Sequence, residues 1–219
     1  MDLSSLIDHT MLKPDALLSD IERLCKEAAE WKFAAVCVNS CHVSDSVRLL
    51  AGTGVAVCAV VGFPLGACAS EVKAFEAGYA KRCGASEVDM VINVSWLKDG
   101  FYKRVYDDIC SVVTAAPGCR VKVIIETCLL TNDEIIKACE IAKSAGAHFV
   151  KTSTGFSKGG AKTEDVALMR SVVGRDFGVK ASGGIRDLKS AEEMVEAGAN
   201  RLGTSQSVQI CESAGIADH

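Results

Sequence analysis

Short apolar runs alternate with longer amphipathic stretches along the whole of this chain. Apolar residues recur at helical spacing in several of the longer stretches, for example 20–32, 70–82, 131–145 and 188–197. Three of these stretches end in a small-residue signal that contains glycine, which is typical of the position just past a helix. The short runs are predicted as strands at 6–10, 34–39, 55–63, 87–93, 120–127, 149–154, 179–182 and 201–205.

The number and order of these units favour one architecture. Strands that alternate with helices usually build a parallel sheet covered by helices, and eight such units favour a closed ring. We therefore predict an α/β fold, a (β/α)8 TIM barrel, with residues 1–219 forming a single domain. The alternative is an open doubly wound sheet, but no Gly-x-Gly-x-x-Gly follows the first strand and the phosphate-type glycines come late in the chain.

Side-chain alternation predicts which strand residues face the interior of the barrel, because successive residues of a strand point to opposite faces. In the run 87–93, Val88, Met90 and Ile92 share one face, and Asp89 lies on the other. The same alternation applied to the other strands predicts five charged side chains inside the barrel: Asp89, Lys122, Glu126, Lys151 and Lys180.

Charged groups are costly to bury unless they are paired or needed for chemistry, so this set indicates a reaction chamber. The alternative is a buried ion-pair network that only fixes the barrel. Lys151 and Lys180, placed late in consecutive strands, favour the chemical interpretation. A free lysine amine has a pKa near 10.4, and only roughly one in two thousand is neutral at pH 7. A second ammonium about 5 Å away would disfavour protonation by roughly 3 kcal/mol and thereby activate an amine for Schiff-base chemistry.

This reasoning does not decide which lysine is the nucleophile, because either amine could activate the other. An acid or base such as Asp89 would have to move protons while an imine forms. A metal site is not expected, since Cys37, Cys41 and His42 match no common zinc spacing.

Composition restricts the class of protein further. The formal charge is -4, with 49% hydrophobic residues and no basic run, which argues against nucleic acid as a partner. Eleven cysteines scattered through apolar stretches are typical of reduced thiols rather than a disulfide framework. The chain shows neither a leader-like start nor an apolar stretch long enough to cross a bilayer, so we expect no membrane partner and a cytoplasmic location.

Seven segments, in order along nearly the whole chain, resemble the deoxyribose-phosphate aldolase family. The most specific are Lys151-Thr152-Ser153-Thr154-Gly155-Phe156 and Lys180-Ala181-Ser182-Gly183-Gly184-Ile185-Arg186. The others lie at 8–10, 36–39, 62–66, 87–93 and 122–127.

The resemblance implies roles for individual residues. Lys151 would form the imine, Lys180 would be the partner amine that keeps the nucleophile neutral, and Asp89 would donate and accept protons. By the same resemblance, Asp8 and Lys122 support the proton relay, and Cys37 lines the pocket near the small aldehyde.

The resemblance also implies the reaction. A class I aldolase would cleave 2-deoxy-D-ribose 5-phosphate reversibly to D-glyceraldehyde 3-phosphate and acetaldehyde. Its partners would be a phosphorylated sugar and a short aldehyde, and it would need no cofactor and no metal, because the protonated imine serves as the electron sink.

Glycines that follow the last strands predict a phosphate site. Gly155, Gly183 and Gly184 come at strand ends where barrels bind phosphate through backbone amides, and Ser205 can add a hydroxyl. The alternative is that these glycines only turn the strand into the loop. Gln206 stands where the family usually has a small residue, which puts its effect on phosphate contacts in doubt.

Two other functions remain open from the sequence. One is a phosphate-binding barrel isomerase or synthase in which Lys151 and Lys180 only pair with an anionic substrate. The other is a barrel that has lost catalysis and serves as a binding partner, but Asp89, Lys151 and Lys180 are all present. A homodimer is a possibility that the sequence does not decide.

Overall fold

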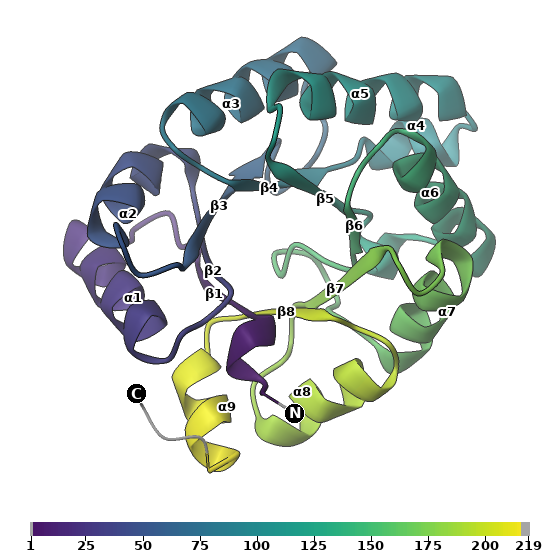
Figure 1. Ribbon diagram of the computed structural model, residues 1–219. Helices are drawn as coiled ribbons and strands as arrows, with labels where there is room; N and C mark the ends of the chain where they lie inside the picture. Colours follow the sequence, from purple (N-terminus) through teal and green to yellow (C-terminus); the bar gives the residue numbers. More distant parts are fainter. Residues whose placement is uncertain (1, 216–219) are drawn as a thin grey trace.

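The computed structural model describes residues 2–215, and these form a closed ring of eight parallel strands surrounded by helices (Figure 1). Each strand pairs with the next one in the chain, and β1 also pairs with β8. The predicted (β/α)8 barrel is confirmed, and the open doubly wound alternative is wrong. The strands are β1 Ile7–Met11, β2 Ala35–Val38, β3 Ala56–Val61, β4 Glu87–Val91, β5 Arg120–Ile124, β6 Phe149–Lys151, β7 Gly178–Ser182 and β8 Arg201–Thr204.

The helices form the outer layer, and local sequence sets where they begin. Helix α6 starts with a capping box, in which the Thr131 hydroxyl accepts a hydrogen bond from the Glu134 amide and the Glu134 carboxylate accepts one from the Thr131 amide. The α-helices are α1 Leu18–Glu30, α2 Val43–Leu49, α3 Ser70–Arg82, α4 Val94–Lys98, α5 Tyr102–Ala115, α6 Asn132–Ser144, α7 Thr163–Val173, α8 Leu188–Glu196 and α9 Ser207–Ser213. Short 3-10 helices are η1 Ser4–Leu6, η2 Ser40–His42 and η3 Thr127–Leu129.

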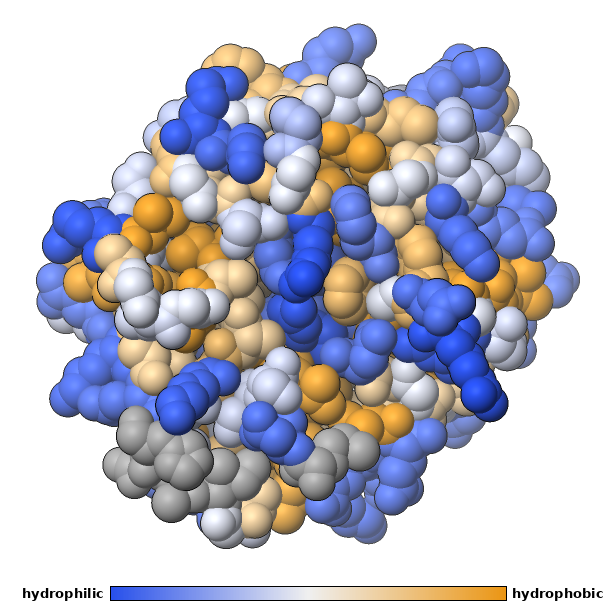
Figure 2. Space-filling view, viewed as in Figure 1, coloured by the Kyte–Doolittle hydropathy of each residue, from blue (hydrophilic) through white to orange (hydrophobic). Residues whose placement is uncertain are grey.

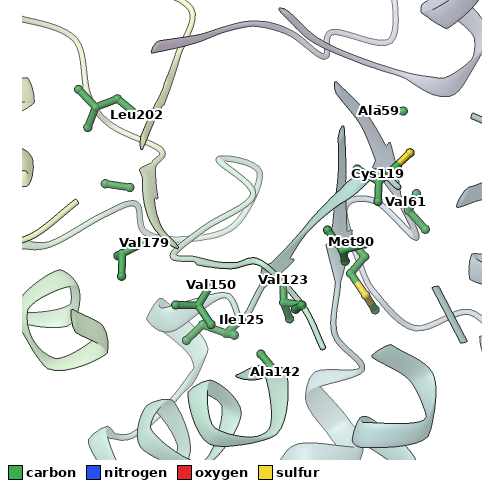
Figure 3. Close-up of a cluster of buried hydrophobic side chains, with 14 of the residues drawn as sticks. Ala59, Val61, Met90, Cys119, Val123, Ile125, Ala142, Val150, Val179 and Leu202 are labelled. Atoms are coloured by element: carbon green, nitrogen blue, oxygen red, sulfur yellow. The ribbon is translucent and has the colours of Figure 1, made fainter. Parts of the chain in front are cut away.

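The main hydrophobic core lies between the strands and the helices. Figure 3 shows Val123, Ile125 and Val150 pointing out of the ring, with Ala142 of α6 facing them. Burial of these apolar side chains fixes each helix against the sheet. The alternate residues of each strand then point into the interior of the barrel. Within residues 2–215, no helix combines the length and the apolar character that crossing a bilayer requires.

Several strands end earlier than the sequence predicts, and the polar residues that follow them form loops. Strand β5 ends at Ile124, and Glu126 has a left-handed backbone with φ 57°. Its buried carboxylate accepts hydrogen bonds from the backbone amide and the hydroxyl of Thr154, in the loop after β6. Glu126 is therefore buried as expected, but it joins two loops and shares no ion pair with the interior lysines.

Candidate active site

Asp89 of β4 lies at the centre of a cluster of charged side chains inside the barrel. Its Oδ2 accepts hydrogen bonds from Lys151 of β6 at 2.7 Å and from Lys180 of β7 at 2.8 Å. Its Oδ1 accepts a hydrogen bond from Lys122 of β5 at 2.8 Å. Strand register explains this meeting, because Asp89 pairs with Lys122 and Lys151 pairs with Lys180 on neighbouring strands. All four side chains face the interior, as the alternation predicts.

Asp8 of β1 connects this centre to β8. One of its oxygens, Oδ2, accepts a hydrogen bond from Lys180 and lies 3.3 Å from the Lys122 amine. The other, Oδ1, accepts a hydrogen bond from Arg201 at 2.6 Å. Asp8 therefore lies in contact with Lys122 and Lys180, in the position expected for a member of a relay.

The charges of the cluster stabilise one another. Burial alone would raise the pKa of Asp89, but Lys122, Lys151 and Lys180 together hold that pKa well below its ordinary value. Burial would likewise raise the pKa of Asp8, and Lys122, Lys180 and Arg201 lower it instead. Burial would lower the pKa of Lys180, but Asp8 and Asp89 raise it, so Lys180 remains an ammonium at neutral pH.

A cavity of about 430 Å³ opens at the carboxyl end of the strands, and Lys151 lies in its wall. The Lys122 and Lys180 side chains are fully buried, whereas Lys151 retains 3% exposure. Among the lysines of the cluster, Lys151 alone contributes to the cavity wall. A bound carbonyl compound can therefore reach this amine and not the other two.

The far wall of the cavity contains the predicted phosphate residues. Gly155, Gly183, Gly184 and Ser205 all line it, and the three glycines have positive φ angles of 84°, 84° and 81°. Such backbone is strained for any residue with a Cβ, so glycine is required at these turns. At these three positions the wall presents backbone without a side chain, which suits an anion bound by amide groups.

Polar and charged side chains complete the rim of this wall. Lys13 and Arg186 line it and supply positive charge near the glycines. Gln206 also lines it, next to Ser205, so its amide lies within the proposed anion site.

Cys37 lies in the cluster beside Asp89 and is not among the residues that line this cavity, although the resemblance implied that it lines the pocket. It is 1% exposed, and its Sγ is 4.0 Å from Asp89 Oδ2. Cys58 of β3 lies closer to Asp89, with its Sγ 3.0 Å from Oδ1 and 3.2 Å from the Lys122 amine. These two thiols and Asp89 place ligand-type atoms within 4.8 Å of one another, but the Lys122 and Lys180 ammonium groups already contact Asp89 and repel a metal cation.

Three charged residues of the site were absent from the sequence prediction. Glu87 and Arg201 are the first residues of β4 and β8, and both share the parity of the interior positions, so the alternation test could have found them. Arg201 contacts both Asp8 and Glu87. Lys13 lies in the loop between β1 and α1, where no periodic pattern indicates its direction.

A parallel barrel with a buried lysine centre beside an anion-type cavity defines a barrel enzyme that acts on a small carbonyl substrate. A family model described as "DeoC/LacD family aldolase" matches residues 3–214. The chain belongs to this family of aldolases.

Several individual proteins are similar to this chain. A deoxyribose-phosphate aldolase of Clostridium tetani is 59% identical over 97% of this chain and 99% of the relative. Among solved structures, a putative deoxyribose-phosphate aldolase from Coccidioides immitis has a TM-score of 0.96 at 46% identity and covers 98% of this chain and 86% of its own. A deoxyribose phosphate aldolase from Aeropyrum pernix, described as tetrameric, has a TM-score of 0.91 at 36% identity and covers 97% of this chain and 91% of its own.

Proposed function

We propose that this chain is a class I aldolase that cleaves 2-deoxy-D-ribose 5-phosphate reversibly to D-glyceraldehyde 3-phosphate and acetaldehyde. The observation that carries this proposal is the position of Lys151, which lines the cavity and whose amine donates to the central carboxylate of Asp89. The names of relatives at up to 59% identity support the choice of substrate. The reaction needs a carbonyl within reach of an amine and an anion site further along the same cavity.

Lys151 is the proposed nucleophile, and Lys180 is its charged partner. Both amines donate to the same oxygen of Asp89. The distance between the two nitrogen atoms is therefore no greater than the sum of the lengths of those two hydrogen bonds. Lys180 is held as an ammonium by Asp8 and Asp89, and its positive charge disfavours a second one on Lys151. A Schiff-base reaction needs a neutral amine as nucleophile, and a neighbouring cation is a recognised way to obtain one.

The proposed bond changes follow from this arrangement. The Lys151 amine adds to the C1 aldehyde of the open-chain sugar, and loss of water gives a protonated imine. Removal of the C3 hydroxyl proton then breaks the C2–C3 bond: C3 becomes the aldehyde carbon of the departing D-glyceraldehyde 3-phosphate, and the electron pair moves towards the imine and leaves an enamine on Lys151. Protonation of the enamine and hydrolysis release acetaldehyde. Asp89 contacts both Lys151 and Lys180, and it is the proposed group that passes protons between them.

The phosphate group is proposed to bind at the glycine wall. Gly155, Gly183 and Gly184 present backbone close to the ligand, Ser205 adds a hydroxyl, and Lys13 and Arg186 add charge at the rim. Asp8 and Lys122 are proposed as supporting members of the relay, since both contact the central group. Cys37 is proposed to support the aldehyde end indirectly, through its position beside Asp89.

Trapping of the imine tests the proposal. Acetaldehyde with borohydride should attach a two-carbon group to Lys151, which peptide mass spectrometry would locate. Incubation with deoxyribose 5-phosphate should release acetaldehyde. A folded protein that acquires no adduct at Lys151 would instead support the isomerase or synthase alternative, in which the lysines only pair with an anion.

We also propose that two copies of the chain associate through α3. Val72, Phe75 and Tyr79 follow one another on the exposed face of this helix, with 54%, 69% and 42% exposure. Glu71 lies near its amino end and Arg82 at its carboxyl end, so an antiparallel pair of α3 helices about a two-fold axis places opposite charges together. The tetrameric description of one relative is in keeping with association in this family.

Light scattering after gel filtration tests this surface. Phe75→Glu should give a monomer, whereas the control Phe101→Glu changes a 45% exposed aromatic outside α3 and should not alter the mass. Equal masses for both variants and the parent would remove the proposal.

A cytoplasmic location is proposed on the basis of the thiols. All eleven cysteines lie within the described residues and are free, and six of them are buried. A reducing compartment is where such thiols persist. Fractionation of native cells would check the location.

A further inference from the structure

Seven charged side chains form one connected, buried network inside the barrel. With every lysine protonated, its cations outnumber its carboxylates by one, because Lys122, Lys151, Lys180 and Arg201 face Asp8, Glu87 and Asp89. An uncompensated charge is expensive in a buried site, so the network favours the loss of one proton. Arginine does not give up its proton in proteins, and the proton must therefore leave a lysine.

The contacts of the three lysines indicate which one loses it. Lys122 lies within ion-pair distance of three carboxylates, Asp8 at 3.3 Å, Glu87 at 2.6 Å and Asp89 at 2.8 Å. Lys180 contacts two of them, Asp8 and Asp89. Lys151 contacts only Asp89, at 2.7 Å. Lys151, which lines the cavity, is therefore the lysine with the fewest carboxylate partners.

Arg201 and Glu87 lie at the opposite end of the barrel from the cavity. They begin β8 and β4, whereas the cavity opens at the carboxyl ends of the strands. In Figure 2, hydrophilic side chains gather in the middle of the face in front of the ring, the face on which Figure 1 places η1 before β1. Neither Arg201 nor Glu87 lines the cavity, so any influence on the chemistry must pass through the network.

We propose that Arg201 and Glu87 are positioning residues that set the charge of the Lys151 amine through the ion-pair network. Arg201 supplies a permanent positive charge, so that the network holds one more cation than carboxylates when every lysine is protonated. Without the negative charge of Glu87 the excess would be two. This inference rests on the proposed aldolase function, since only a Schiff-base reaction requires a neutral Lys151.

The charged and titratable groups near Lys151 come from every neighbouring strand of the interior. Asp89 on β4 accepts a hydrogen bond from Lys151. Lys180 on β7 and Lys122 on β5 donate hydrogen bonds to the same carboxylate. Asp8 on β1, Cys37 on β2 and Cys58 on β3 complete the set. Burial raises the pKa of the Cys58 thiol well above its usual value, so that group stays neutral, whereas the hydrogen bond with Cys58 lowers the pKa of the Cys37 thiol.

The experiment measures how the free amine of Lys151 depends on pH. Acetaldehyde and cyanoborohydride label this amine, and the labelling rate is followed by mass spectrometry across a pH series. Arg201→Gln removes the surplus charge and should move the midpoint of the profile to higher pH. Glu87→Gln enlarges the surplus and should move it to lower pH. A unit charge acting over about 10 Å at an effective dielectric near 20 predicts shifts of roughly one pH unit, or tenfold in free amine.

Two further variants separate charge from structure. The double variant Arg201→Gln/Glu87→Gln restores the original difference between cations and carboxylates, so its midpoint should return close to that of the parent. Arg120→Gln is the matched control, because Arg120 also contacts Glu87, at 3.4 Å, but its side chain is 61% exposed. Its loss should leave the midpoint in place, since solvent screens an exposed charge.

The possible outcomes are distinguishable. Absence of any adduct at Lys151 in the parent protein would reject the aldolase function itself. An adduct whose midpoint is the same in the parent, Arg201→Gln and Glu87→Gln would leave that function standing and overturn this inference. Should Arg201→Gln fail to fold, the shift in Glu87→Gln and the recovery in the double variant still decide the matter.

Discussion

At the scale of single residues, Lys151 differs from its neighbours in two ways that matter for chemistry. It has one carboxylate partner, and it lies in a cavity wall. Lys180 has two carboxylate partners and no exposure. The two lysines are therefore proposed to serve two purposes, Lys151 as an accessible amine and Lys180 as a buried charge.

Leucine substitutions separate these two purposes. Lys151→Leu should abolish cleavage of deoxyribose 5-phosphate, because no other lysine of the cluster lines the cavity. Lys180→Leu should lower kcat by a hundredfold or more, about 3 kcal/mol of barrier, because the positive charge beside the Lys151 amine is then lost. Single-turnover assays of acetaldehyde release would measure both effects, and a rate equal to the parent in either variant would contradict the assigned roles.

Gly160, which packs against Gly183 of the anion wall, offers a second test at this scale. A Cβ on Gly160 would lie 2.2 Å from the Gly183 carbonyl oxygen, so Gly160→Ala must push apart the loops after β6 and β7. We expect a higher KM for the phosphorylated substrate by tenfold or more, as phosphate contacts are lost. Gly78→Ala, with its nearest contact at 3.4 Å, is the control and should leave KM unchanged.

Residue-level prediction succeeded where alternation applied and failed where it stopped. Alternation placed Asp89, Lys122, Lys151 and Lys180 inside the barrel, because each lies within a paired strand. Glu126 has the same parity as Lys122, but the backbone turns left-handed at Glu126 and directs its carboxylate to Thr154. Sequence parity carries no information beyond the last paired residue.

At the scale of elements, one buried ion pair joins α3 to α5. The Lys73 amine lies 2.6 Å from Asp108 Oδ2, and neither side chain is exposed. Asp108 Oδ1 has no hydrogen-bond partner among the described residues. Such a pair fixes how the two helices meet, but it carries the desolvation cost of both charges.

Removal of one partner should therefore cost more than removal of both. Lys73→Met should lower the free energy of unfolding by about 3–5 kcal/mol, because it leaves Asp108 buried and unpaired. Lys73→Met/Asp108→Leu should recover much of that loss. Urea unfolding would measure each variant, with Lys103→Met, which removes an exposed pair with Asp107, as a control of little effect. A double variant as unstable as the single one would show that the pair itself supplies the stability.

Element boundaries were predictable only where a local signal marks them. Helices α3, α6 and α8 begin and end within about one residue of their predicted limits, and Thr131 and Asp187 cap two of them. Strand ends were predicted too long, for example at β5 and β6, because apolar and β-branched residues continue into loops that no neighbouring strand pairs. Strand ends depend on pairing partners that are distant in sequence.

At the scale of the whole molecule, the buried network links stability to pH. The pKa values of Asp8 and Asp89 lie below their unfolded value near 3.9, so their contribution is complete above about pH 4 and is lost as pH falls further. The pKa values of Lys122 and Lys180 are raised above about 10.4, and their contribution is lost only as pH rises beyond that value.

Stability should therefore fall below about pH 4 as Asp8 and Asp89 gain protons, and above about pH 10 as Lys122 and Lys180 lose theirs. Urea midpoints across a pH series would measure this profile. Asp8→Asn should lower stability at pH 7 and flatten the acid side, since one of the responsible carboxyl groups is gone. If stability fell equally steeply with decreasing pH in Asp8→Asn and in the parent, the loss of stability in acid would be due to other groups.

The barrel itself was predictable because eight strand and helix units admit few arrangements. What the sequence left open was the charge balance of the interior, which depends on Glu87 and Arg201 meeting across the ring. These residues are 114 positions apart, and only closure of the sheet brings them together.

Closure also governs how the chain can assemble during synthesis. The ladder between β1 and β8 joins the first strand of the sheet to the last, so the ring stays open until residues 201–204 are available. Until then β1 and β7 each present a row of unpaired amides and carbonyls, which can recruit the strands of other nascent chains. A chain cut before Arg201 should therefore aggregate, whereas the finished ring offers no strand edge and can meet a partner only through its helices and loops.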